Sequence, residues 1–467
     1  MSKEKTLFKN TAIVTVGKML TQLISFLLLP LYTAYLSTSE YGTVDLVNTL
    51  TSLILPFLTF QIDQGIFRYL IDVRNNEEKI SKFISTSIIF LVFQSVIYTF
   101  IFMVGATFIK NEYKYFLLVF LIVNSFSNVL LQVTRGIGDN VRYTVGSFIY
   151  AVVGIILNVI LIAGFKMGAY GMLIATIAGN IICIVYIIIA KKLYKVISIK
   201  KYNKESLQEL LKYSFPLVPN AISWWIVNAS DRVIISILIN IEANGIYSVA
   251  NKFSSVITTI FNIFSITWTE SASINYNEED RDEFFNKIYD IIFRLFGSIC
   301  LLVISFMPFV FSILIDSKYN EAYLQIPILM IATFFNILVV FLGSIYVAKK
   351  LTKEIAKTSV MAAVINIVTN LLMIKFIDLY AASISTLLAW FSMYIYRSID
   401  SKKYVNLKLN KNLICSLIIV VAVSVVTYYI HNIIICAIVA ALTLIYAIII
   451  NKKIYGFVLN TLKEKLY

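Results

Sequence analysis

Eight charged side chains inside long apolar stretches are the candidates for chemistry, because an ionised group is hard to accommodate there. Five are basic and three are acidic: Lys18, Arg68, Arg232, Lys252 and Arg294, and Asp63, Asp231 and Glu270. At the centre of a bilayer each such residue costs about 2.5–3.5 kcal/mol on insertion scales, so it needs a polar cavity or a partner. A cleft with this excess of cations suits an anionic ligand such as a phosphate. The three acidic residues are the candidates for coupling to an ion.

These charges also have simpler explanations. A long basic side chain can carry its charge back to the membrane surface, and this explains Lys18, Arg68 and Arg294 equally well. The acidic side chains are too short to do so, which favours a cavity or an ion-pair partner for them. Asp231 and Arg232 are adjacent in the chain and can also form a structural pair.

Prolines and tryptophans gather close to that adjacent pair. Pro216 and Pro219 predict a bent helix, because proline removes a backbone donor and disrupts helical packing. The bend can serve as a hinge, and a static kink explains it at least as well. Trp224, Trp225 and Trp268 are candidates for stacking on sugar rings, although we expect at least one of them to be a packing residue.

Signals of enzymatic or metal chemistry are missing from the sequence. The single histidine, His431, is expected in a solvated turn, with a proton relay as the less favoured alternative. The four cysteines lie in apolar stretches without metal-ligand spacing: Cys183, Cys300, Cys415 and Cys436. Because no Walker A lysine, H-E-x-x-H motif or dinucleotide-binding glycine loop occurs, we expect neither an enzyme nor a cofactor.

Composition places all these residues in a membrane. The chain has 467 residues, of which 59% are hydrophobic and 14% are charged, whereas soluble domains are about 45–50% apolar and about a quarter charged. The prediction is an all-α polytopic membrane protein of about 14 transmembrane helices. The spans are expected at residues 11–35, 43–70, 83–109, 115–134, 143–165, 169–190, 210–239, 246–274, 287–315, 322–348, 355–377, 379–396, 412–430 and 432–450.

The basic residues predict the orientation of these spans. With the N-terminus in the cytoplasm, 30 of the 40 Lys and Arg residues fall in cytoplasmic segments, and 5 fall in outer loops. This asymmetry is typical of an even number of spans with both termini in the cytoplasm, here in the cell membrane. The net charge of +14 therefore needs no nucleic acid partner, and we expect no cleavable signal peptide.

An internal repeat predicts two lobes. A shift of 203 residues places Gly42 and Asn48 on Gly245 and Asn251, and GAYGMLIAT at 168–176 resembles DLYAASIST at 378–386. Spans 1, 2, 7 and 8 are then equivalent pairs that line a central cleft, and together with span 9 they carry most of the buried charge. The predicted division is a six-helix lobe at 1–190, a cytoplasmic linker at 191–207, a six-helix lobe at 208–398, and helices 13–14 with a tail at 399–467.

Two segments carry a resemblance to a known family. Residues Tyr213–Phe253 contain two prolines, the pair Asp231–Arg232 and a G-x-Y-x-x-A-x-K run, and the opening at Lys9–Lys18 is followed by PLYTAYLSTSEYG at Pro30–Gly42. These elements resemble Wzx-type polysaccharide flippases. They form the polysaccharide-transport branch of the multidrug/oligosaccharidyl-lipid/polysaccharide exporter superfamily, and the similarity extends over essentially the whole chain.

The resemblance implies a function that the residues alone do not. It implies a V-shaped, two-lobed fold that moves an undecaprenyl-diphosphate-linked oligosaccharide to the outer leaflet by alternating access. Lys18, Arg68 and Lys252 are suitably placed to receive the diphosphate, and helices 13–14 are candidates for a lipid-tail groove. Expected partners are membrane lipids and, for the exported glycan, the polysaccharide polymerase and export machinery.

Other functions remain open on the sequence. An ion-coupled drug/cation antiporter of the same superfamily is the first alternative. Such proteins usually have twelve spans and keep acidic residues in the first lobe, where this chain has Asp45 and Asp63, but its predicted cleft holds more cations than anions. A major-facilitator carrier would show G-x3-D-R-x-G-R-R, which DVRNNEEK at 72–79 does not match. A membrane glycan polymerase or ligase would need a long outer loop, and uncoupled lipid scrambling is also possible.

Overall fold

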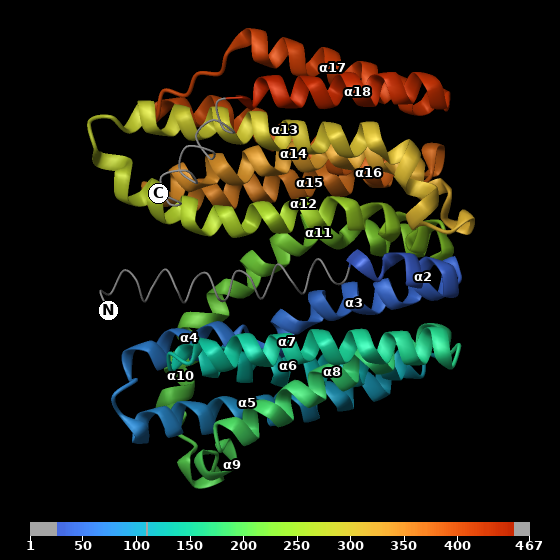
Figure 1. The fold of residues 1–467 in the computed structure, drawn as a ribbon. Coiled ribbons are helices and arrows are strands. Elements are labelled where there is room, and N and C mark those ends of the chain that lie inside the picture. Colours follow the sequence, from blue (N-terminus) through green and yellow to red (C-terminus); the bar gives the residue numbers. More distant parts are fainter. Residues whose placement is uncertain (1–25, 109–110, 453–467) are drawn as a thin grey trace, which may run out of the picture. The chain divides into compact units, whose positions relative to one another are not determined.

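The computed structural model describes residues 26–108 and 111–452, and these residues form helices without β-strands (Figure 1). Within them, 13 helices are long and apolar enough to cross a membrane. The predicted all-α polytopic class is thereby confirmed. Most of the first predicted span, 11–35, lies outside the described residues, as does Lys18.

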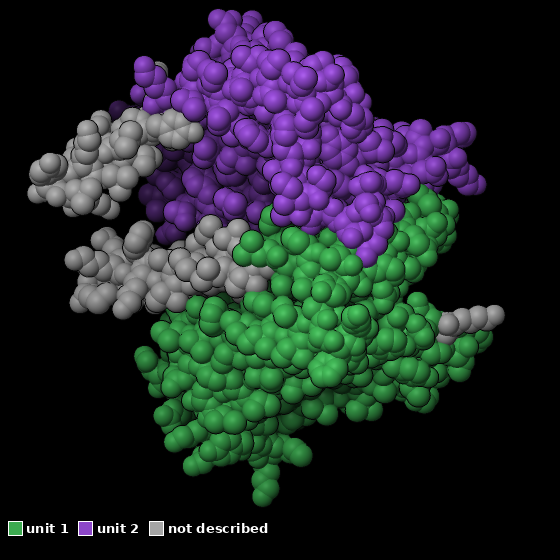
Figure 2. Space-filling view, turned by 45° about the vertical axis from the view of Figure 1, so that its right-hand side comes forward, with its two compact units in different colours: residues 1–245 green, residues 246–467 purple. Residues whose placement is uncertain are grey.

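The chain divides into two compact units, Met1–Gly245 and Ile246–Tyr467 (Figure 2). Helices of the first unit are α2 (Leu29–Tyr35), α3 (Thr38–Thr59), α4 (Ile62–Asp72), α5 (Glu77–Ala106), α6 (Lys114–Gly136), α7 (Asn140–Asn158), α8 (Gly168–Ala190), α9 (Leu193–Val196), α10 (Lys204–Ser214) and α11 (Val218–Leu238). After α12 (Ile241–Ile274), which begins in the first unit, the second contains α13 (Arg281–Leu314), α14 (Glu321–Ala348), α15 (Thr352–Ile377), α16 (Leu379–Asp400), α17 (Lys411–Ile430) and α18 (Ile433–Ile450).

The core of the first unit forms around α4. Ile62, Ile66 and Leu70 recur every fourth residue, so they share one helix face, and all three are fully buried. They belong to one cluster with apolar residues of α5, α6 and α8. The side chains of Phe93 and Val96 on α5 are exposed instead, which suits a surface that faces lipid.

The second predicted span, 43–70, is two helices rather than one. Phe60 and Gln61 separate α3 from α4, and both adopt left-handed conformations with φ of 49° and 56°. The Thr59 hydroxyl accepts a hydrogen bond from the Gln61 amide, which partly replaces the missing helical bonding. Neither residue is glycine, so the sequence gives no warning of this break.

The two prolines of the seventh predicted span mark a junction. Pro216 lies in a 3-10 turn at Phe215–Leu217, and Pro219 lies in the first turn of α11. Proline is well tolerated there because a first-turn amide has no partner within the helix. Helix α10 packs on α4 and α5, and α11 packs on α3, so both belong to the first compact unit. The predicted lobe at 208–398 starts within α10 and stays a prediction.

Two turns support the sequence interpretation in detail. Helix α17 ends before His431, and the Asn432 side chain caps α18 by accepting hydrogen bonds from the Ile434 and Ile435 amides, which confirms the weak break predicted there. Gly168 and Asp378, which are aligned in the two repeat segments, both have positive φ, of 54° and 45°. The two repeat segments thus share a positive φ at equivalent positions as well as similar residues.

Candidate functional site

One ion pair that involves a predicted site residue joins α11 to α3. The Arg232 Nε atom lies 3.2 Å from Asp45 Oδ2, and the two side chains are only 21% and 16% exposed. Neither of these two atoms forms a hydrogen bond within the described residues, so the contact is an ion pair alone. The ion pair therefore links two helices in surroundings where Coulomb attraction is stronger than in water.

A tryptophan extends this contact along both helices. Trp225 Nε1 lies 3.0 Å from the Thr49 carbonyl oxygen and 3.1 Å from Ser52 Oγ, and donates a hydrogen bond to them. Trp225 lies two turns before Arg232, and Asp45, Thr49 and Ser52 follow one face of α3. We call these five residues the α3–α11 polar face. Sequence reasoning missed it, although the i, i+4, i+7 spacing of Asp45, Thr49 and Ser52 was a usable signal.

Asp231 and its neighbour Arg232 have different surroundings. Asp231 is 4% exposed, whereas Arg232 reaches Asp45 on α3. Consecutive helical residues point about 100° apart, since one turn takes about 3.6 residues. The predicted contact of Asp231 with Lys252, which is partly buried on α12, stays a prediction.

Two of the charges on α4, Arg68 and Asp72, lie at the surface of the first unit. Arg68 Nη1 is 2.6 Å from Asp72 Oδ1, and the side chains are 48% and 57% exposed. Such an exposed pair one turn apart contributes little to stability, so a competing anion can replace Asp72 at little cost. Asp63, in the first turn of α4, accepts a hydrogen bond from Gln64.

Arg294 in the second unit ties two helices together. Its guanidinium donates to Asp290 Oδ2 at 2.7 Å and to the Ile450 carbonyl at 3.2 Å. Ile450 is the last residue of α18, where backbone carbonyls lack helical partners and a cation is favourable. These contacts describe a packing role, and the predicted role of Arg294 in a cleft stays a prediction.

The remaining candidates on α12 differ in exposure. Glu270 is exposed, whereas Trp268 is 3% exposed and stacks on Phe341 with ring centroids 4.8 Å apart. Tyr289 stacks on the same Phe341 ring at 5.1 Å. Trp268 is therefore a packing aromatic in this structure. Trp224 is half-buried on α11, with its stacking role untested.

An ionic cluster and a buried arginine lie near helix ends that the sequence assigns to the cytoplasm. Asp139, between α6 and α7, accepts hydrogen bonds from Arg142 and from Lys191 Nζ, the latter at 2.8 Å. In the second unit Arg397 is buried and donates to Thr358 Oγ1 and the Val339 carbonyl. Sequence reasoning counted these cations only as topology signals, because their partners are distant in the chain.

An apolar cavity of about 460 Å³ lies within the second unit, among α13, α14, α16 and α17. Its lining includes Cys300, Phe335, Leu417 and Val421, and no charged side chain is among the lining residues. Such a cavity suits a hydrocarbon chain, whose burial gains about 25 cal/mol for each Å² removed from water. Among the described residues, no cluster of three His, Cys, Asp or Glu side chains could hold a metal ion.

Known structures share this fold. An inward-facing multidrug resistance MATE family transporter of the MOP superfamily has a TM-score of 0.65 at 14% identity, covering 84% of this chain and 98% of its own. A MATE in complex with MaL6 has a TM-score of 0.58 at 14% identity, covering 85% and 96%. A MOP superfamily transporter from Pyrococcus furiosus has a TM-score of 0.51 at 13% identity, covering 84% and 95%. At these identities the likeness shows the fold alone.

Comparison with protein-family models also places this chain in a sequence family. The model of the family described as polysaccharide biosynthesis protein matches residues 7–269, which is more than half of the chain. No curated protein sequence matches this chain. This multi-pass membrane protein has the fold of MOP superfamily transporters, and it belongs to the polysaccharide biosynthesis protein family.

Proposed function

We propose that this protein is a lipid-linked oligosaccharide flippase. It moves glycan units on undecaprenyl diphosphate from the cytoplasmic to the outer leaflet of the cell membrane by alternating access. The glycans are destined for capsule, exopolysaccharide or O-antigen type export. The family match over residues 7–269 supports a glycan cargo, and the transporter fold supports movement across the membrane rather than catalysis.

The observation that carries the lipid part of this proposal is the apolar cavity beside α17. A drug or cation carrier needs no hydrocarbon site, whereas a polyprenyl-linked cargo must keep its tail in apolar surroundings during transfer. Helix α17, which is the predicted helix 13, forms one wall of the cavity. It supports the role proposed for helices 13–14 as a lipid-tail groove.

The diphosphate requires cations that can give up their present partners. Arg68 is the best candidate of those described, because both it and Asp72 are exposed to an approaching anion. A phosphate offers Arg a bidentate contact, which is stronger than an exposed carboxylate pair. Arg232 is held by Asp45 in a less exposed pair, so we assign it to positioning α11.

Ion-coupled drug/cation antiport is the second candidate function. The MATE structures with the same fold favour it, and so do the acidic residues Asp63 and Asp231 in the first unit. It predicts uptake or efflux of a cationic dye with no glycan phenotype. The flippase function predicts a glycan phenotype with no transport of the cationic dye.

Depletion of the protein in its own cells separates these functions. We expect undecaprenyl-diphosphate oligosaccharide to accumulate in the cytoplasmic leaflet while resistance to ethidium stays unchanged. The amount is measured after lipid extraction, and its sidedness by digestion of intact spheroplasts with a glycosidase. Altered ethidium resistance with normal levels of lipid-linked glycan would instead support the antiporter.

A further inference from the structure

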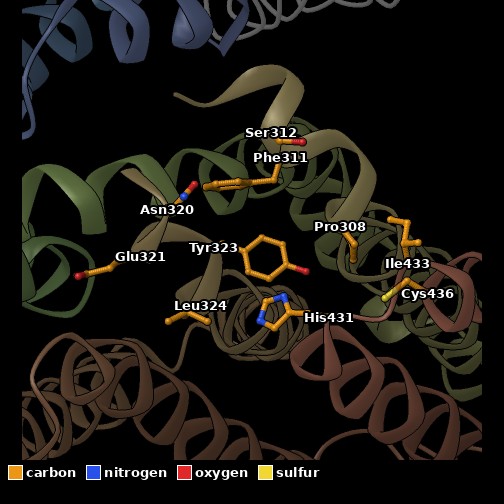
Figure 3. Close-up of a pocket in the computed structure, with 10 residues that line it drawn as sticks. All are labelled: Pro308, Phe311, Ser312, Asn320, Glu321, Tyr323, Leu324, His431, Ile433 and Cys436. Atoms are coloured by element: carbon orange, nitrogen blue, oxygen red, sulfur yellow. The ribbon is translucent and has the colours of Figure 1, made fainter. Parts of the chain in front are cut away.

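A second, more polar pocket of about 420 Å³ lies at one end of the second unit (Figure 3). It is formed by the end of α13, the start of α14 and the turn between α17 and α18. We call it the Tyr323 pocket, and its lining includes Phe311, Ser312, Asn320, Glu321, Tyr323 and His431. The apolar cavity described above shares none of these residues.

The aromatic wall of this pocket is held firmly. The Tyr323 ring stacks on Tyr428 with centroids 4.0 Å apart, and Phe311 meets it edge-on at 5.3 Å. Tyr428 also donates a hydrogen bond of 2.6 Å from its hydroxyl to the Tyr323 carbonyl oxygen. A fixed ring loses little conformational entropy when a ligand packs against it.

His431 completes the wall from an unusual backbone position. Its φ is 58°, in the left-handed region that glycine occupies most easily after a helix. Its imidazole lies 5.4 Å from the Tyr323 ring, and Figure 3 shows both rings at the centre of the pocket.

The chemistry of the lining points to a class of ligand. A carboxylate, an amide, a hydroxyl and an imidazole provide hydrogen-bonding groups beside aromatic and aliphatic surfaces, as ligand sites of this volume commonly do. No lysine or arginine is among the lining residues, which argues against a phosphate. A sugar ring presents apolar C–H faces and a rim of hydroxyls, and it matches both kinds of surface.

We propose that the Tyr323 pocket binds one or two uncharged sugar units of a glycan at the outer face of the membrane. The outer position follows from the predicted topology, because the α13–α14 turn carries one lysine and the α17–α18 turn carries none. The proposal rests on the proposed function for the source of the sugar. Glu321 accepts hydrogen bonds from sugar hydroxyls, and the Tyr323 ring packs against the sugar.

The single histidine of the chain gives a direct test. The full protein, purified with a tag that contains no histidine and labelled with ¹³C,¹⁵N-histidine, shows one imidazole signal by NMR. The probe is the neutral oligosaccharide released by mild acid from the cells' own lipid-linked glycan, and inorganic pyrophosphate serves as the comparison. We expect a saturable shift of the His431 signal with the oligosaccharide and none with pyrophosphate.

Two variants sharpen the result. Glu321→Gln should weaken the oligosaccharide affinity about tenfold, the loss expected for one hydrogen bond to a charged group. Glu354→Gln, a carboxylate change in the first turn of α15 outside the pocket, should leave the affinity unchanged. An unmoved His431 signal, or equal oligosaccharide affinities for the two variants, would overturn the proposal that the Tyr323 pocket binds sugar. Normal glycan flipping with a silent His431 rejects only this inference, whereas sugar binding without flipping rejects only the transport proposal.

Discussion

Gly42 and Gly245, which are equivalent in the two sequence repeats, pack against each other's helix at the starts of α3 and α12. A Cβ atom on Gly42 would overlap the Ile241 carbonyl oxygen, and one on Gly245 would overlap the Thr38 carbonyl oxygen. Thr38 and Ile241 are themselves related by the same shift of 203 residues. The repeat is therefore visible as a reciprocal backbone contact, which the Asn244 side chain reinforces by donating a 3.0 Å hydrogen bond to the Gly42 carbonyl.

This contact predicts intolerance of any side chain at either glycine. Gly42→Ala or Gly245→Ala should destabilise the protein by about 1–3 kcal/mol, the usual cost of overpacking, because backbone atoms must move apart. Gly154→Ala is the matched control, since its added methyl group would meet nothing within 4 Å beyond its chain neighbours and the nearby backbone of its own helix. Thermal unfolding in detergent, followed by intrinsic fluorescence, measures the difference. Equal melting temperatures for Gly42→Ala and Gly154→Ala would refute the close contact.

The Asp45–Arg232 pair predicts coupled effects on stability. Removing one charge leaves the other partly buried and unpaired, so Asp45→Asn or Arg232→Gln alone should be destabilising. The double variant should be milder than the sum, with an interaction energy of about 0.5–3 kcal/mol. A double-mutant cycle on thermal stability measures this energy. Additive effects would mean that the pair does not stabilise the α3–α11 packing.

Arg68 should matter for export more than for folding. Arg68→Ala should lower glycan export about tenfold, because one charge-assisted hydrogen bond to the cargo is lost. Arg68→Lys should retain more export, since it keeps the charge. Lys82→Ala is the control, because Lys82 forms an equally exposed pair one turn from Glu78, at 2.9 Å. Export of surface glycan is compared at matched protein levels, and equal export by the two alanine variants would remove Arg68 from the site.

Asp139 predicts an acid-dependent loss of stability in the first unit. Burial alone raises the pKa of this carboxyl, but hydrogen bonds from Lys191 and Arg142 outweigh burial and hold the pKa below its ordinary value. The stabilisation is therefore fully present above the unfolded pKa of about 3.9 and is lost as the pH falls through the lower folded value. The difference in melting temperature between the native protein and Asp139→Asn should shrink below about pH 4. A difference that does not change with pH would contradict this assignment.

The spans and turns could be predicted because hydropathy and helix-end residues act locally. The break at His431–Asn432 has a polar residue that caps the next helix, whereas the break at Phe60–Gln61 has no glycine or proline to mark it. The candidate site was harder to predict, since Asp45 and Arg232 lie far apart in the chain. Arg294 illustrates the same limit, because its contact with the end of α18 exists only after packing.

The central claim is that this protein moves a lipid-linked glycan between leaflets. The most direct measurement reconstitutes the purified protein in liposomes that contain undecaprenyl-diphosphate oligosaccharide in both leaflets. A membrane-impermeant glycosidase added outside then reports how much glycan reaches the outer leaflet. We predict that nearly all of the glycan becomes cleavable with the protein and only the outer-leaflet fraction without it. Cleavage that stops at the outer-leaflet fraction, in liposomes where the protein is folded and any coupling ion gradient is supplied, would contradict the proposed function.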